Sequence, residues 1–461
     1  MPRFVRSTRL PVDVDEAFAW HERPGALQRL SPPFLPGKVE RSDGSITPGS
    51  EVVLRLGPPR LAPRWVARHT TYEPPREFAE YQASGPFAAW NHRHRFAPDA
   101  TDRALLTDDV TYRLPLGQLG EAVAGPLVRQ QIARMFAYRH RVTVADLATH
   151  AAARSKGVRS MRVAITGASG LIGQALSTFL TTGGHDVVPV VRSAPGPNDV
   201  GWNPDEGEID AEALRGVDAV VHLAGEPIAA RRWTEAQKQR ILDSRVKGTR
   251  LLAETLAELG TAGPSTLVSA SGIHYYGDRG DEVLTEDSAP GDGFLEWVCR
   301  EWEAATAPAA DAGVRVVNLR TGIALTPRGG ALARQLPLFR LGVGGPFGNG
   351  RQYDSWISLE DVIGLYHHAL TNSEVSGPMN ATAPNPVTNA EFARVLGAVL
   401  RRPARLPVPK LGPKLLLGEM AEALVYTSQR ALPRVALDTG YQFRHPHLEG
   451  CLRELLGRPG A

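Results

Sequence analysis

Three evenly spaced glycines stand where an apolar run gives way to a predicted helix. The segment follows residues 163–166 and reads Gly167-Ala168-Ser169-Gly170-Leu171-Ile172-Gly173. In a loop of this kind the first glycine permits a tight turn, the second lets the backbone approach a pyrophosphate, and the third permits close helix–strand packing. The helix N-terminus adds free N–H groups and a partial positive charge. The segment therefore predicts a dinucleotide-binding loop, with GxxGxxG spacing rather than GxGxxG.

The end of the next predicted strand bears on which dinucleotide is bound. Residues 185–191 lead into Arg192-Ser193, where an NAD-binding protein usually carries Asp or Glu for the ribose 2′-hydroxyl. Arg192 offers a cation for a 2′-phosphate instead, which favours NADP(H) over NAD(H). The alternative is a solvated arginine, because Arg is common throughout this chain.

Short apolar strands alternate with helices after residue 160. Strands are expected at 163–166, 187–191, 219–223, 266–269 and 314–319, and helices at 171–181, 235–259 and 294–310. This alternation predicts an α/β fold with a Rossmann-type, doubly wound parallel sheet. Gly and Pro become frequent from about residue 328, which indicates a small C-terminal lobe over the carboxyl edge of the sheet.

The first 150 residues show a different pattern, with short strands followed by one long helix. Strands are expected at 4–10, 52–56, 65–72, 77–82, 88–96 and 104–112, and Asp13 with Glu16 resembles a capping box. The helix at 117–150, which Pro126 is expected to kink or restart, places six apolar residues on roughly one side. They are Leu119, Val123, Leu127, Ile132, Phe136 and Val144. A helix laid on a curved antiparallel sheet would form an α+β domain enclosing a cavity.

Length and composition limit the remaining possibilities. A chain of 461 residues suggests two or three domains, and we expect residues 1–150, a linker at 151–160, a nucleotide-binding domain at 161–400 and a C-terminal domain at 401–461. A net charge of +3 without a basic cluster argues against nucleic-acid binding. Two cysteines fit a reducing compartment, and no apolar stretch suits a signal peptide or membrane span. The expected location is the cytoplasm.

Several segments after Met161 resemble the atypical, epimerase-family branch of the extended short-chain dehydrogenase/reductase superfamily. They are 221–228, Arg232-Trp233-Thr234, Ser244-Arg245-Val246, Tyr275-Tyr276-Gly277-Asp278, 344–348, Ser355-Trp356-Ile357, 380–384, 416–420 and 440–446. The last two resemble that family's own C-terminal domain.

The resemblance implies an NADP(H) cofactor and a small nucleotide-sugar-like or carbonyl substrate. Members of the superfamily often pair through helices, so a homodimer is one expectation; the alternative is that the extra domain blocks that surface. Match to the family pattern assigns Leu223, Ala224, Gly225 and Glu226 to the cofactor site, with Leu223 and Ala224 along the adenosine side. It also directs Arg245 toward the cofactor and places Ile323 at the nicotinamide end. The alternative for Arg245 is a cation on the surface of a helix.

The sequence departs from the superfamily pattern where catalysis is expected. Standard members use a Tyr general base and a Lys four residues later, and the matching positions here are Leu295 and Cys299. The remaining candidates are Ser271, Tyr275 and Tyr276, which could instead bind substrate or pack the loop. A Tyr without a neighbouring Lys keeps a pKa near ~10 and is a weak base at neutral pH. Three functions stay open. The first is an NADP(H)-dependent epimerase or oxidoreductase, and the second is a catalytically inactive NADP(H)-binding sensor or regulatory protein. In the third, the nucleotide-binding domain reduces an apolar ligand that the N-terminal domain binds.

Residues 1–150 resemble a START-like, polyketide-cyclase-type (SRPBCC) helix-grip domain. The resemblance is carried by the strand order, by Gly85-Pro86-Phe87 and by the run 90–96, and it implies an apolar ligand. Within that run His92 and His94 face the same side of a strand, but the spacing shows no third ligand, so no metal site is predicted. We expect a pocket-lining or hydrogen-bonded pair, and Asp108-Asp109 on a solvated strand edge or turn.

Overall fold

The computed structural model describes residues 1–35, 37–57, 62–409, 415 and 418–458. The chain forms two compact units, one of residues 1–159 with 178–184, the other of residues 160–177 with 185–461. The long helix of the first unit continues to Ser155, so the first half of the predicted linker is helical.

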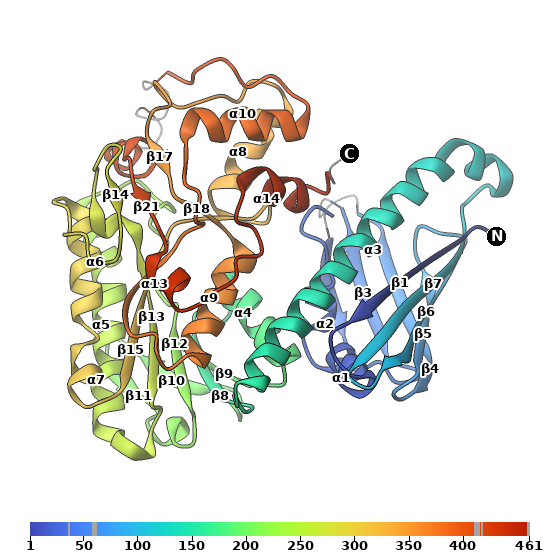
Figure 1. The fold of residues 1–461 in the computed structure, drawn as a ribbon, viewed down its shortest axis with the longest axis horizontal. Helices are drawn as coiled ribbons and strands as arrows, with labels where there is room; N and C mark the ends of the chain where they lie inside the picture. Colours follow the sequence, from blue (N-terminus) through green and yellow to red (C-terminus); the bar gives the residue numbers. More distant parts are fainter. Residues whose placement is uncertain (36, 58–61, 410–414, 416–417, 459–461) are drawn as a thin grey trace. The chain divides into compact units, whose positions relative to one another are not determined.

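The first unit contains a seven-stranded antiparallel sheet and a long helix (Figure 1). Its strands pair in the order β1-β7-β6-β5-β4-β3-β2, and the edge strand β2 was not predicted. The strands are β1 (Arg3–Leu10), β2 (Gly37–Ser42), β3 (Glu51–Leu56), β4 (Arg64–Glu73), β5 (Glu77–Ser84), β6 (Ala89–Ala100) and β7 (Arg103–Arg113). The helices are α1 (Val14–Glu22), α2 (Ala26–Arg29) and α3 (Gly117–Ser155).

Two local predictions for this unit have different outcomes. The carboxylate of Asp13 caps α1 by accepting a 2.8 Å hydrogen bond from the Glu16 N–H, which confirms the predicted N-cap. Helix α3 runs through Pro126 without a break, so the helix does not restart there, and the expected kink stays a prediction.

The predicted apolar side of α3 is buried only in part. Ile132 and Phe136 are buried, whereas Leu119, Val123 and Leu127 are exposed, so the expectation of one shared buried side is wrong for the first turns. The physical reason is length. A helix of 39 residues spans about 58 Å, whereas the 12-residue strand β6 spans about 40 Å, so the helix outruns the sheet.

The second unit is an α/β fold with an eight-stranded sheet, as predicted. The order is β11-β10-β9-β8-β12-β13-β15-β19, parallel except between β10 and β11. The strands are β8 (Arg162–Thr166), β9 (Asp186–Val191), β10 (Val200–Asn203), β11 (Glu208–Ile209), β12 (Ala219–His222), β13 (Thr266–Gly272), β15 (Arg315–Thr321) and β19 (Gly377–Ala381). Strands β9, β10 and β11 lie on one side of β8, and the later strands, from β12 on, lie on its other side. The strand order therefore reverses between β8 and β12, and α/β proteins bind ligands at such a point.

Helices cover both faces of this sheet (Figure 1). Figure 1 shows α5, α6 and α7 on one side of the sheet and α4 and α9 on the other. Their bounds are α4 (Leu171–Thr182), α5 (Glu235–Leu259), α6 (Phe294–Ala304), α7 (Ala307–Asp311) and α9 (Leu359–Thr371). The predicted helix 294–310 is therefore two helices, and Pro308 lies in the first turn of the second, where a proline is tolerated.

A smaller lobe follows β15, as the Gly and Pro content predicted. Its elements are β16 (Ile323–Leu325), α8 (Gly330–Arg340), β17 (Tyr353–Asp354), β18 (Trp356–Ser358), β20 (Val387–Thr388), α10 (Asn389–Leu400), α12 (Glu419–Ala421), β21 (Arg430–Ala431), α13 (Arg434–Asp438) and α14 (Leu448–Leu455). Phe339, Trp356 and Phe392 belong to its buried core. Residues 416–417 of the predicted C-terminal match lie outside the described residues. In the described part of the chain, no helix is both long and apolar enough to cross a membrane.

The uneven burial of α3 predicts a difference between two truncations on the same helix. Phe136→Ala removes a fully buried ring and should lower the free energy of unfolding of the N-terminal unit by about 3–5 kcal/mol. Val123→Ala removes a side chain that is 79% exposed and should change it by less than about 0.5 kcal/mol. Urea-dependent hydrogen exchange of the β6 and β7 amides measures both. Equal effects would contradict this assignment.

Candidate functional site

The turn between β8 and α4 is held by very close backbone packing. Gly167 has a φ of +66°, in the left-handed region that favours glycine. A Cβ on Gly173 would lie 2.2 Å from the Gly167 carbonyl oxygen, and a Cβ on Gly167 would lie 3.1 Å from the Ala224 nitrogen. The turn therefore needs glycine at both positions, and for the predicted reasons.

Thr166 joins the ends of two central strands at this turn. Its hydroxyl oxygen accepts hydrogen bonds from the N–H groups of Leu223 (3.0 Å) and Ala224 (3.1 Å), just beyond β12. Leu223 and Ala224, both predicted cofactor contacts, thereby lie beside Gly167.

The first turn of α4 completes a cradle suited to an anion. The N–H groups at the start of a helix have no acceptor within that helix, and the helix dipole is positive there. In α4 these groups belong to Leu171, Ile172 and Gly173, directly after Ala168, Ser169 and Gly170. The narrow glycine turn leaves backbone rather than side chains facing this space, so the residues present fit a dinucleotide pyrophosphate.

Arg192 and Ser193 follow the end of β9 and are both exposed. Arg192 makes no ion pair with any other described residue. Its guanidinium is thus available to a phosphate beside this strand end. That role for Arg192 stays a prediction.

Arg245 lies beneath the loop that follows β12. It is 6% exposed, and its Nη1 donates to the carbonyl oxygens of Glu226 (3.1 Å) and Ile241 (3.0 Å). Its guanidinium carbon lies 4.9 Å from the ring centroid of Trp302, and burial lowers its pKa to about 10. The alternative of a surface cation is wrong. In this structure Arg245 supports the backbone of the predicted cofactor segment Gly225-Glu226.

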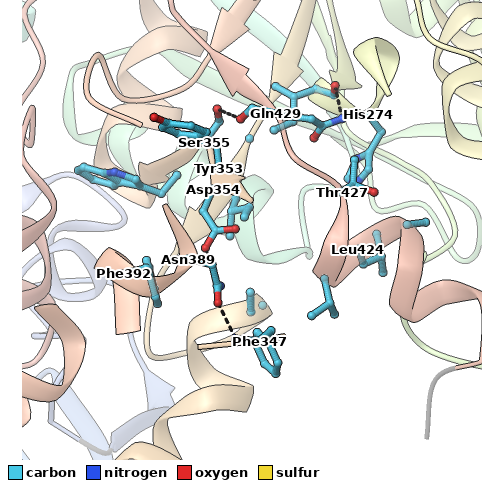
Figure 2. A pocket seen from close by; sticks show the side chains of 18 of the residues that line it. His274, Phe347, Tyr353, Asp354, Ser355, Asn389, Phe392, Leu424, Thr427 and Gln429 are labelled. Carbon is cyan, nitrogen blue, oxygen red and sulfur yellow. Dashed lines mark hydrogen bonds between the residues drawn. The ribbon is translucent and has the colours of Figure 1, made fainter. Parts of the chain in front are cut away.

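A cavity of about 410 Å³ opens beside the carboxyl end of the sheet. Ile323, the residue predicted to line the nicotinamide end, forms part of its wall, as does Ile273 just beyond β13. Figure 2 shows Asp354 and Asn389 on one wall and Thr427 and Leu424 on another. The cavity therefore adjoins the place where a nicotinamide ring is expected.

Two titratable groups in this wall have shifted pKa values. Burial raises the pKa of the Asp354 carboxyl to about 7, although Asn389 Nδ2 donates to it at 2.9 Å. Burial, aided by the charge of Arg245, lowers the pKa of His274 to about 4. At neutral pH the imidazole is therefore uncharged, and Asp354 exchanges a proton readily.

The predicted catalytic candidates Ser271, Tyr275 and Tyr276 do not line this cavity. They belong to a buried network around Arg320. Ser271 Oγ donates to Glu303 at 2.7 Å, and Glu303 forms an ion pair with Arg320 at 2.7 Å.

The two tyrosines contact the same guanidinium. Arg320 Nη1 donates to the Tyr276 hydroxyl at 3.0 Å, and that hydroxyl donates to Asn380 at 2.7 Å. The Arg320 guanidinium carbon lies 3.5 Å from the Tyr275 ring centroid. Burial raises the pKa of Tyr276 to about 12, so even less of it is ionised at neutral pH than of a free tyrosine. These contacts favour the alternative that the three residues pack the loop.

Leu295 and Cys299, at the usual Tyr and Lys positions, are both buried in α6. Burial raises the pKa of the Cys299 thiol to about 12. Neither side chain is suited to proton transfer.

The polar cavity residues His274, Asp354, Asn389 and Gln429 were missed by the sequence analysis. One signal was available, because Asp354 directly precedes the family-like segment Ser355-Trp356-Ile357. Nothing local could reveal the others, since they come from separate elements that meet only in the folded lobe.

Comparison with known proteins identifies the family. A family model described as the NAD dependent epimerase/dehydratase family matches residues 163–381, and one described as a domain of unknown function (DUF1731) matches residues 408–455. Epimerase family protein Mb2239 of Mycobacterium bovis is 45% identical over 299 residues, which are 65% of this chain and 98% of that protein. The chain belongs to the NAD dependent epimerase/dehydratase family. The terminal match also agrees with the predicted family-specific C-terminal segment.

Solved structures of relatives extend this result. The crystal structure of a nucleoside-diphosphate sugar epimerase from Corynebacterium glutamicum has a TM-score of 0.80 and 36% identity, covering 98% of this chain and 90% of that one. Human epimerase family protein SDR39U1, solved with NADPH, has a TM-score of 0.60 and 38% identity, covering 64% and 99%. The Rossmann-type fold is confirmed, and the predicted cofactor, NADP(H), is present in this human relative of the family.

The predictions for the N-terminal unit are tested only in part. The structure shows a seven-stranded antiparallel sheet with α3, and the Corynebacterium structure covers nearly the whole chain. The START-like assignment stays a prediction. The expectation of a solvated Asp108-Asp109 is wrong, because both side chains are buried, and Asp109 pairs with Arg3 at 2.7 Å.

The raised pKa of Asp354 predicts how stability depends on pH. A carboxyl whose pKa rises from 3.8 to about 7 on folding disfavours the folded state increasingly as pH rises through that interval. Asp354→Asn should therefore raise the Tm at pH 8 and change it little at pH 4. Thermal unfolding at several pH values tests this, with the exposed Asp311→Asn as the control. A shift of equal size at every pH would rule out the buried carboxyl as its cause.

Proposed function

We propose that this protein binds NADP(H) at the β8–α4 turn and catalyses oxidation or reduction of a small, largely apolar carbonyl or alcohol. One observation carries the proposal: Ile323, assigned to the nicotinamide end, lines the 410 Å³ cavity. The glycine cradle and the NADPH bound by the human relative support the choice of cofactor. When bound, the nicotinamide supplies or accepts the hydride.

The lining of the cavity favours a carbonyl compound over a nucleotide sugar. Most of the wall is apolar, with Ile273, Phe347, Trp356, Phe392 and Leu424 among its residues. Among the described lining residues, Arg334 is the only Arg or Lys side chain. A nucleoside diphosphate brings two phosphates, which proteins usually bind with several cationic or N–H donors.

Asp354 and His274 are the proton-transfer candidates in this proposal. A general acid or base works best when its pKa lies near the working pH, and the pKa of Asp354 is about 7. The neutral imidazole of His274 can orient a substrate oxygen by donating or accepting a hydrogen bond. These residues would take the place of the absent Tyr and Lys.

A second function is favoured by a separate observation. Leu295 and Cys299 leave α6 without the usual proton-transfer pair, and both are buried. A protein that binds NADP(H) without turnover, and acts as a sensor, would fit this loss. In either case the N-terminal unit would bind an apolar ligand, as its START-like resemblance implies. The predicted homodimer and cytoplasmic location stay predictions.

The cofactor preference is tested at Arg192. Arg192→Ala should weaken NADP(H) binding by roughly tenfold to a hundredfold, the value of one charge-assisted hydrogen bond of about 1.5–3 kcal/mol. NAD(H) binding should stay unchanged, because NAD(H) lacks the 2′-phosphate. Isothermal titration calorimetry with both nucleotides measures this, with the exposed Arg300→Ala as a matched control. A variant that still prefers NADP(H) by the original factor would exclude this role for Arg192.

Turnover is tested with NADPH and three substrate classes. We expect NADPH oxidation with quinones or lipid carbonyls, followed at the nicotinamide absorbance band, and Asp354→Asn should lower kcat by roughly 10²–10⁴. Tyr276→Phe should retain the activity and lose stability only. Turnover of nucleotide sugars alone would overturn the substrate class; it is followed by separating the sugar epimers, because epimerisation causes no net change in the nicotinamide. Tight NADPH binding without turnover of any class would overturn catalysis and support the sensor.

A further inference from the structure

A buried cluster of histidines and carboxylates lies inside the N-terminal unit. Its side chains come from neighbouring strands at matching positions. Glu80 on β5 stands opposite both His92 on β6 and His69 on β4, and His94 on β6 stands opposite Asp108 on β7. Because paired residues of a sheet point to the same face, the pairing alone brings these five side chains together.

Three of these residues present donor atoms to one point. His92 Nδ1 lies 3.0 Å from Glu80 Oε1, and His94 Nε2 lies 3.6 Å from Glu80 Oε2. One donor atom from each of the three residues lies within 4.8 Å of the others. Ligands held about 2.0–2.2 Å from a central metal ion are themselves about 3–3.5 Å apart. The three side chains need to move little to share one ion.

The other nitrogen of each imidazole faces a second carboxylate. Asp108 Oδ1 is hydrogen-bonded to His92 Nε2 at 2.9 Å and lies 2.7 Å from His94 Nδ1, where the angles do not form a hydrogen bond. Histidines that bind metals almost always donate their other ring N–H to a carboxylate, carbonyl or water, which fixes the tautomer. Asp108 also contacts His140 Nε2 of α3 at 2.6 Å, which holds the carboxylate in place. In the metal-free structure the inner Nδ1 of His92 faces Glu80 as a donor, so it would lose its proton to bind an ion beside that carboxylate.

A fourth donor and an open side are also present. His69 Nε2 lies 3.7 Å from Glu80 Oε2, while its Nδ1 contacts the Ser50 carbonyl oxygen at 3.4 Å. Glu80 has a side-chain exposure of 18%, whereas His92 has 1%. An ion held by Glu80 would therefore lie at the least buried part of the cluster, where an ion or a further ligand can enter.

The charge of the cluster points in the same direction. Glu80 and Asp108 make ion pairs only with histidines among the described residues, and none with Arg or Lys. Buried carboxylates need compensating positive charge, which protonated histidines supply in the metal-free chain and a divalent ion would supply when bound. Two imidazoles and one carboxylate suit divalent first-row transition metals such as Zn²⁺ or Fe²⁺.

We propose that Glu80, His92 and His94 bind a divalent transition-metal ion, with His69 as an additional ligand and Asp108 as the residue that orients His92 and lies against His94. The sequence concealed this site because Glu80 lies twelve positions before His92 and is joined to it by strand pairing. The site is independent of the nucleotide fold and of the oxidoreductase proposed above.

Co²⁺ binding to the full chain tests the proposal, because Co²⁺ reports its ligands through visible absorption. After treatment with a chelator, the wild-type chain should bind Co²⁺ with d–d bands that differ from those of the aqueous ion, and Zn²⁺ should displace it. Glu80→Gln and His92→Gln should each abolish one equivalent of this uptake. His447→Gln, on an exposed histidine at the start of α14, should leave it unchanged.

The role of Asp108 has its own readout. Asp108→Asn should weaken Zn²⁺ binding by roughly 10–100-fold while keeping the stoichiometry, the effect expected for an outer partner of ligating histidines. Circular dichroism of each variant shows whether it folds. A wild-type chain without Co²⁺ uptake overturns the site even if no variant folds, whereas uptake is assigned to this cluster by a folded Glu80→Gln or His92→Gln. Wild-type chain that takes up no Co²⁺, or uptake unchanged in a folded Glu80→Gln, would overturn the site and leave a metal-free ion-pair network.

Discussion

The nucleotide site depends on a steric constraint at the end of β8. The chain turns from strand to helix so tightly that a Cβ on Gly173 would collide with the Gly167 carbonyl oxygen. Thr166 then draws the end of β12 against the same turn by accepting two backbone hydrogen bonds. Because β8 and β12 diverge into different connections beyond this point, the cradle opens at the carboxyl edge of the sheet. Arg245 donates a hydrogen bond to the Glu226 carbonyl oxygen and so supports the loop that follows β12. The surface offered to a nucleotide at this turn therefore consists largely of backbone groups.

A second constraint is the buried ion pair of Arg320 with Glu303. Ser271 donates a hydrogen bond to Glu303, and Arg320 donates one to Tyr276. The Tyr275 ring packs against the Arg320 guanidinium. A buried guanidinium needs all its donors satisfied, so Ser271 and Tyr276 are held in the core, and the partly buried Tyr275 packs against the guanidinium. Polar groups from the C-terminal lobe and from the segment after β13 line the cavity instead. The shifted pKa values of Asp354 and His274 follow from the low polarity of that wall.

In the N-terminal unit, strand pairing determines which polar side chains are buried together. Alternation along β6 buries Trp90, His92, His94 and Phe96 together, as the sequence predicted. Antiparallel pairing then determines which residues face the two histidines, and these are Glu80 and Asp108. A shift of one residue in the pairing would send both carboxylates to the opposite face. The cluster is therefore a property of the whole sheet and not of any one segment.

The amino-acid sequence by itself determined the features that depend on near neighbours. These include the α/β pattern, the glycine turn, the helix at 235–259, the cap at Asp13 and the absence of the usual Tyr and Lys. Only the tertiary structure decided that Arg245 is buried, that Tyr276 serves the core, and that Asp354 faces a cavity. It also decided where α3 leaves its sheet and which carboxylate meets His92. The physical reason is that dihedral preference and periodicity act over a few residues, whereas burial, charge pairing and cavity lining depend on residues tens to a hundred positions apart.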